Sequence, residues 1–285
     1  MLEWATPFGR PFLAVTYREP NNNNMDILFY IAAGAGVGLA IGLTGVGGGS
    51  LMTPLLILFG FPYNVAIGTD LLYAAITKAG GMVTHARQQT VQWRTVGFLA
   101  AGSIPASMVT AQLLSSVFTD SSEYQGILTR SLGVMLVLTA TVILFNGRLR
   151  DRSAQSEGAM AHFLHQHRDR VIFLAGLFLG VFVTLSSVGA GAFCAAILMM
   201  LYPHMPALKV IGTDISHAVP LTLIAGLGHL ILLGNVDFML LACLLAGSLP
   251  AIQIGTKLAA RIPGRLLQTI IATMLFAMGV KFAAF

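Results

Sequence analysis

The chain has 285 residues, of which 56% are apolar and only 9% are Asp, Glu, Lys or Arg, whereas soluble proteins carry about 25% charged residues. So few charges cannot cover the surface of a water-soluble fold, and a mean hydropathy of +0.80 indicates that its solvent is lipid. Composition therefore excludes an ordinary soluble protein and predicts an all-α polytopic membrane protein. The chain has 16 Lys and Arg against 11 Asp and Glu. In a membrane protein such an excess of basic residues mostly reflects the charge of the cytoplasmic loops and does not indicate nucleic-acid binding.

Residues 1–26 form an N-terminal extension without the pattern of a signal peptide. From Ile27 onward the sequence is a series of apolar runs, each of which predicts a helix: 27–44, 50–60, 64–86, 95–117, 129–146, 171–187, 191–202, 207–233, 236–258 and 265–284. Two runs, 50–60 and 191–202, are too short to cross about 30 Å of hydrocarbon. Because each follows a glycine-rich break, each predicts a re-entrant hairpin or a broken helix.

The two halves of the chain repeat each other. The matching anchors are Val46-Gly47 with Val188-Gly189, Gly68-Thr69-Asp70 with Gly212-Thr213-Asp214, His85 with His229, and Gly102-Ser103-Ile104-Pro105 with Gly247-Ser248-Leu249-Pro250. We therefore divide the chain into repeat one (27–146), a basic linker (147–170) and repeat two (171–285). An odd number of segments in each half predicts inverted repeats with eight to ten transmembrane helices.

Loop charge predicts the orientation. Basic residues gather in the linker and in the turns near 87–94 and 257–265, all expected on one face, while the opposite loops hold Asp120, Glu123 and Asp237. The positive-inside rule then places the linker in the cytoplasm and both termini outside it. We expect a multi-pass protein of the inner (plasma) membrane.

Asp70 and Asp214 lie inside apolar runs at equivalent positions of the two repeats. An intramembrane carboxylate is costly and normally faces a polar cavity, a partner or a proton route. The alternative is that each aspartate caps backbone amides at an unwound turn. The functional interpretation gives Asp70 and Asp214 a role in proton coupling or gating.

The glycine breaks suggest an anion site, because helices that begin there point free N–H groups at whatever fills the space. This hypothesis assigns substrate binding to Gly47, Gly48, Gly49, Ser50, Gly189 and Gly191, and extends it to Gly68, Thr69, Gly212 and Thr213 beside the aspartates. Close helix packing is the alternative explanation for the glycines.

Other titratable residues add to this pattern. His217 follows Asp214 by one turn and is the expected proton partner. Lys78, a cation deep in an apolar run, either pairs with Asp70 or a substrate anion, or extends to an interface. His85 and His229 lie either at membrane interfaces or at two ends of one pathway. We expect no metal and no cofactor, and we interpret Cys194 and Cys243 as packing residues.

These motifs resemble the TauE/SafE (sulfite exporter) family of membrane transporters. The resemblance covers nearly the whole chain after Met25. It depends on Gly45-Val-Gly-Gly-Gly-Ser50 followed by Pro54, on Pro62 before Ala66-Ile-Gly-Thr-Asp70, and on the turn Thr90-Val-Gln-Trp-Arg94, which Gly234-Asn-Val-Asp-Phe238 repeats. It implies an inner-membrane exporter of sulfite or other small sulfur-containing anions, driven by ion or proton gradients.

The residues alone favour the same class, since inverted repeats with helix breaks near the midplane indicate alternating access. We expect a secondary transporter of small sulfur-containing or carboxylate anions, without enzymatic activity. Its expected partners are the bilayer and the anion, and a homodimer is compatible with its small-residue faces. The alternative is a membrane-embedded enzyme acting on lipid phosphates, for which only Ser50 is in place near a break.

Overall fold

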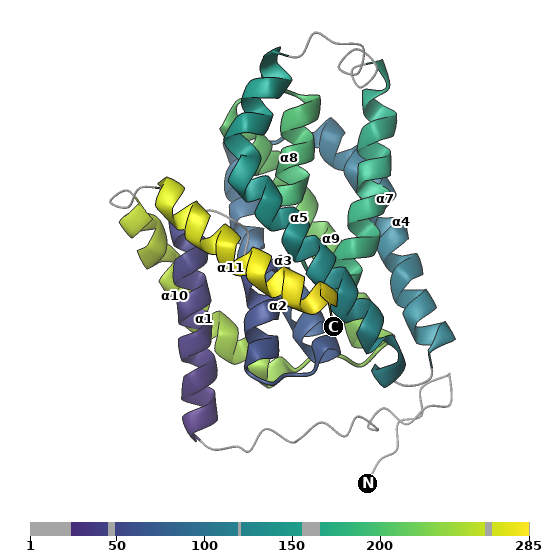
Figure 1. Cartoon of the computed structure of the whole chain (residues 1–285), viewed down its shortest axis with the longest axis vertical. Coiled ribbons are helices and arrows are strands. Elements are labelled where there is room, and N and C mark those ends of the chain that lie inside the picture. The colour runs from purple at the N-terminus through teal and green to yellow at the C-terminus, as the bar shows by residue number, and fades with distance from the viewer. Residues whose placement is uncertain (1–23, 45–48, 119–120, 156–165, 260–263, 285) are drawn as a thin grey trace.

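A computed structural model describes residues 24–44, 49–118, 121–155, 166–259 and 264–284 (Figure 1). These residues form helices and no strands. The ten helices are α1 (Asn24–Thr44), α2 (Gly49–Leu58), α3 (Tyr63–Arg87), α4 (Trp93–Val117), α5 (Ser121–Gln155), α7 (Arg168–Ser186), α8 (Ala192–Leu201), α9 (Ala207–Ile231), α10 (Phe238–Ala259) and α11 (Gly264–Ala284). Each apolar run of the sequence corresponds to one of them, so the all-helical fold class is confirmed.

The largest difference from the predicted boundaries is at α5. The sequence predicts a helix over 129–146, but α5 begins at Ser121 and continues to Gln155, into the predicted linker. Residues 148–155 are mostly polar and contain neither proline nor glycine, so nothing in this stretch ends a helix where the apolar run ends.

Five helices within the described residues are long and apolar enough to cross a membrane: α4, α5 from Tyr124 to Phe145, α7, α9 and α10 up to Leu258. Helix α3 is not among them, although residues 64–75 are all buried. Its first half lies inside the bundle, and the helix carries the polar residues Asn64, Asp70 and Lys78. The predicted count of eight to ten spans therefore remains a prediction.

Both short helices fold back along the helix that precedes them. The ring of Phe59, just after α2, lies 4.7 Å from that of Phe29 near the start of α1. In the second half, the Arg168 guanidinium at the start of α7 lies 4.5 Å from the ring centre of Tyr202, just after α8. This geometry agrees with the hairpin alternative.

The longer helices pack in pairs: α1 with α10, α4 with α7, α5 with α11, and α3 with α9 (Figure 1). In Figure 1 the α1–α10 pair and the α4–α7 pair lie on opposite sides, with α5 and α11 crossing between them. Gly34 and Gly38 of α1 face the α10 backbone, and Gly176 and Gly180 of α7 face that of α4, so that a Cβ at any of them would overlap the partner helix. Small residues thus let these helices approach closely.

The loops gather at two ends of the bundle. At one end, the Asn64 side chain donates a hydrogen bond to Asn235 (2.8 Å), which donates to the Tyr124 hydroxyl (2.8 Å). At the other end, Arg94 pairs with Asp169 (2.7 Å). The turn before α4 and the end of the linker therefore lie at the same end of the bundle, as the number of segments between them predicted.

Candidate functional site

A buried polar cluster lies where α3 and α9 pack against each other. Asp70 of α3 is 0% exposed and Asp214 of α9 is 8% exposed. The Asp70 carboxylate accepts hydrogen bonds from the Thr53 hydroxyl (2.5 Å) and the Thr53 backbone N–H (3.2 Å) of α2. Asp70 therefore binds a backbone amide, but that amide belongs to Thr53 inside α2 and not to an unwound turn.

Lys78 connects this cluster to the break between α7 and α8. It lies two turns beyond Asp70 on α3, and its Nζ donates a hydrogen bond to the Ala190 carbonyl oxygen (2.9 Å). Its charge attracts both Asp70 and Asp214. The ammonium group of Lys78 is partly buried and bonds to the other repeat at this break, and its predicted pairing with Asp70 or a substrate anion stays a prediction.

His217 and Cys194 extend the cluster toward α4 and α8. The His217 Nε2 lies 2.9 Å from the Ser103 hydroxyl of α4, and its Nδ1 lies 3.9 Å from the Cys194 Sγ of α8. His217 and Cys194 are each 0% exposed. Cys194 is buried as expected of a packing residue, but it also contacts the polar cluster.

Several buried polar atoms of the cluster have no hydrogen-bond partner within the described part of the chain. They include Asp70 Oδ1, Asp214 Oδ1 and the hydroxyl of Tyr73, which lies about one turn after Asp70 on α3. An unsatisfied buried polar group costs about 1–3 kcal/mol, and more when it is charged. A polar solute would offset this cost, so the cluster is suited to bind one.

The second glycine break is a compact turn. Gly189 has φ of +113°, a conformation that L side chains rarely adopt, and a Cβ there would overlap the Met135 side chain. The amides of Gly191 and Cys194 donate to the Gly189 carbonyl (2.8 and 3.3 Å). Two amides at the start of α8 are thus used within the turn. Gly47 and Gly48 of the first break lie outside the described residues. Gly49 and Ser50 begin α2, but the structure does not describe the Ser50 side chain.

The glycines and threonines beside the aspartates hold loops from the opposite half of the chain. The Thr69 hydroxyl accepts the Asp237 N–H (3.1 Å), and the Thr213 hydroxyl accepts the Gln92 N–H (3.0 Å). Gly68 lies against the Asn235 carbonyl and Gly212 against the Thr90 carbonyl, where a Cβ would overlap. These two equivalent contacts, which we call the loop clasps, give Gly68, Thr69, Gly212 and Thr213 a supporting role; their predicted contact with substrate stays a prediction.

The two repeated histidines are both hydrogen-bonded within the fold. His85 Nδ1 lies 2.8 Å from the Thr90 hydroxyl in the turn before α4. His229 is fully buried, with its Nε2 2.8 Å from the Thr184 carbonyl of α7. His229 therefore does not lie at an exposed interface.

Sequence reasoning missed Thr53 and Ser103 as members of the cluster. A hydroxyl inside the short apolar run 50–60 was the available signal for Thr53, and Ser103 lies in a repeated Gly-Ser-x-Pro motif. Neither signal indicates which buried group the hydroxyl meets, because both bonds join residues of different helices.

A bundle of apolar helices, five of which in the described residues are long enough to cross a membrane, is typical of a polytopic membrane protein, and this bundle encloses a buried polar cluster. The family model described as "Sulfite exporter TauE/SafE" matches residues 30–282, and the chain belongs to this family. The resemblance found in the sequence is thereby confirmed.

Relatives in other organisms carry transporter names. The chain is 38% identical over 251 residues to the probable membrane transporter protein YjnA of Bacillus subtilis, covering 88% of this chain and 97% of the relative. It is 27% identical to the probable membrane transporter protein YdhB of the same organism (82% and 91% coverage). It is 24% identical to a probable membrane transporter protein of Methanocaldococcus jannaschii (88% and 92%). No solved structure matches the chain significantly.

Proposed function

We propose that the chain is a secondary transporter of the inner membrane that exports sulfite or another small organosulfonate or carboxylate anion by alternating access. The observation that carries this proposal is the position of Lys78, which bonds to the break between α7 and α8 while attracting Asp70 and Asp214. A partly buried cation at a helix break, near groups that can take up protons, is suited to an anionic solute.

The charge of the cluster couples anion binding to protons in this proposal. With both aspartates ionised, Asp70, Asp214 and Lys78 carry a net charge of −1, which repels an anion. When both aspartates are protonated, the net charge is +1 and an anion is attracted. Proton binding and anion binding therefore favour each other, and His217 is the group through which Asp214 exchanges protons.

The packing of the helices supports inverted repeats and alternating access. Suppose that α1, α2, α3, α4 and α5 correspond to α7, α8, α9, α10 and α11 in that order. The α1–α10 pair then corresponds to the α7–α4 pair, and the α3–α9 and α5–α11 pairs each join two corresponding helices. The two loop clasps also exchange under this correspondence. We propose that opening one clasp at a time exposes the adjacent aspartate, Asp70 or Asp214, to one face.

The test is anion flux in proteoliposomes loaded with sulfite, sulfoacetate or sulfate under a pH gradient of either sign. We expect flux that follows the gradient in the wild type and loses its pH dependence in Asp70→Asn and Asp214→Asn variants. Lys281→Met, which removes an exposed cation near the end of α11, is the matched charge control and should transport normally. Unchanged, pH-dependent flux in both aspartate variants would remove the proton role.

Cys194 offers a test of alternating access that does not depend on knowing the substrate. In a Cys243→Ser background, we expect a membrane-impermeant thiol reagent to label Cys194 slowly and from one face at a time. Addition of a transported anion should change the labelling rate. Equal and rapid labelling from both faces would indicate a continuous pore and contradict the proposal.

Transport, and not catalysis, is the activity that the names of the family and its relatives indicate. We accordingly expect purified protein to release no phosphate from a polyprenyl diphosphate. Steady phosphate release that survives in a transport-inactive variant would instead support the enzyme alternative.

A further inference from the structure

A basic pocket opens where α4, α7 and α8 meet at the end of the bundle that carries the Arg94–Asp169 pair. Its volume is about 500 Å³, and its charged lining consists of Arg94, Arg168, Arg170 and Asp169. Among the described residues that line it, three arginines outnumber one aspartate. The pocket therefore favours an anion.

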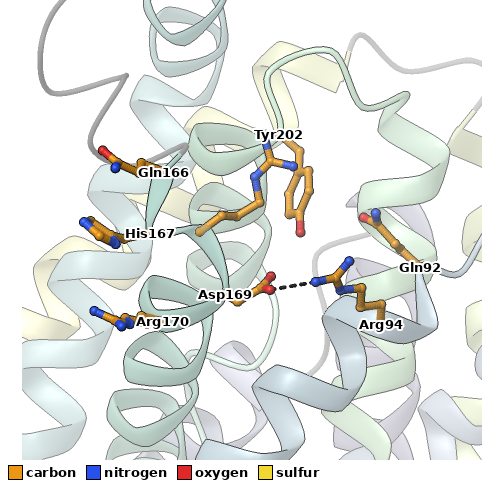
Figure 2. A pocket seen from close by; sticks show the side chains of 8 residues that line it. Gln92, Arg94, Gln166, His167, Asp169, Arg170 and Tyr202 are labelled. Atoms are coloured by element: carbon orange, nitrogen blue, oxygen red, sulfur yellow. Dashed lines mark hydrogen bonds and ion pairs between the residues drawn. The ribbon is translucent and has the colours of Figure 1, made fainter.

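The fold holds these charges in place. The Arg94 Nη2 lies 2.7 Å from the Asp169 Oδ2, which joins the first turn of α4 to that of α7. The Arg168 guanidinium lies over the Tyr202 ring. Figure 2 shows Asp169 directed at Arg94, while Arg170 projects from the other side of the same turn of α7. The arginines thus border the pocket from more than one side.

An apolar groove continues from the basic pocket. It has a volume of about 400 Å³, shares Asp169 and Arg170 with the pocket, and is otherwise lined by Phe98, Phe173 and Leu174. Leu174 lies one turn after Arg170 on α7 and is 61% exposed. The groove therefore follows the outer, apolar surface of α4 and α7, beginning at the level of the arginines.

The repeated fold does not by itself require this charge. The turn Thr90-Val-Gln-Trp-Arg94 corresponds to Asn235-Val-Asp-Phe-Met239 in the second half, so the opposite end has Met239 in the place of Arg94. The positive-inside rule gathers cations at this end of the bundle, so the difference in charge shows where a basic pocket can form. The occupant of the pocket is indicated by the apolar groove that adjoins the arginines.

We propose that this pocket and groove bind an anionic phospholipid, with the phosphodiester at the arginines and an acyl chain between Phe98 and Leu174. A small anion would use the charge but not the groove, and a neutral lipid would use the groove but not the excess positive charge. Basic pockets between transmembrane helices are suited to anionic headgroups. The site is separate from the buried cluster around Lys78 and does not depend on the proposed transport.

The experiment is native mass spectrometry of the full-length protein released from mixed dioleoyl-phosphatidylglycerol and dioleoyl-phosphatidylcholine. We expect selective retention of phosphatidylglycerol, and a loss of affinity on the order of tenfold in an Arg94→Gln, Arg170→Gln double variant. A matched double variant, Arg87→Gln with Lys257→Gln, removes two exposed cations outside the pocket and should retain the lipid. Thermal unfolding verifies that both double variants are folded.

Two further measurements separate a lipid from a small anion. Asp169→Asn removes the acidic group of the pocket and should increase phosphatidylglycerol retention, which a simple loss of folding cannot mimic. Glycerol phosphate and inorganic phosphate, which lack acyl chains, should not displace the lipid at millimolar concentration. Displacement by either, or equal retention in the two double variants, would overturn the proposal.

Discussion

Gly38 provides a sharp test of the α1–α10 interface. An ideal Cβ at this position would lie 2.6 Å from the Ser248 Cα and 2.9 Å from the Ser248 Cβ of α10. Carbon atoms prefer separations of about 3.5–4.0 Å, so the two helices must move apart by about 1 Å. Gly36, on the same helix, has no atom within 4 Å of its ideal Cβ and is therefore the matched control.

The two substitutions should have opposite signs. Overpacking costs about 1–3 kcal/mol, whereas replacing glycine by alanine in a helix gains about 0.5–1 kcal/mol. We expect Gly38→Ala to destabilise the protein by about 1–2 kcal/mol and Gly36→Ala to stabilise it by about 0.5–1 kcal/mol. At about 2–4 °C for each kcal/mol, thermal unfolding in detergent, followed by circular dichroism, resolves the difference. Equal shifts of the same sign in both variants would refute the packing argument.

Two further substitutions test the loop clasps and the buried cluster. Thr69→Val leaves the Asp237 N–H without its acceptor and should lower the free energy of unfolding by about 1 kcal/mol. The control Thr273→Val, at an exposed site on α11, should have little effect. Equal stability of the two variants would show that this loop clasp does not contribute to the stability of the fold. Lys78→Met removes the hydrogen bond to the Ala190 carbonyl and the charge that attracts two buried carboxylates, and should lower the free energy of unfolding by about 1–3 kcal/mol. Adding Asp214→Asn should restore part of this loss, and strict additivity in a double-mutant cycle would show that the two charges do not interact.

The composition and the apolar runs of the sequence determine the helical, lipid-dissolved character of this protein. The ten runs predict the ten helices because the cost of exposing an apolar segment, or of leaving backbone groups unpaired in lipid, is a property of that segment alone. The aspartates of the two Gly-Thr-Asp motifs are conspicuous for a similar reason, since a carboxylate inside an apolar run is costly wherever the run packs.

The partners of those residues are decided only by the tertiary structure. That Thr53 binds Asp70, and that Lys78 reaches Ala190, depends on how α2, α3 and the α7–α8 turn are placed together. The sequence does not predict the role of Gly68 either. A larger residue there would overlap the carbonyl of Asn235, which lies 167 residues further along the chain. Helix formation follows from local sequence, whereas the site is made of contacts between segments far apart in the chain, and those contacts exist only once the helices have packed.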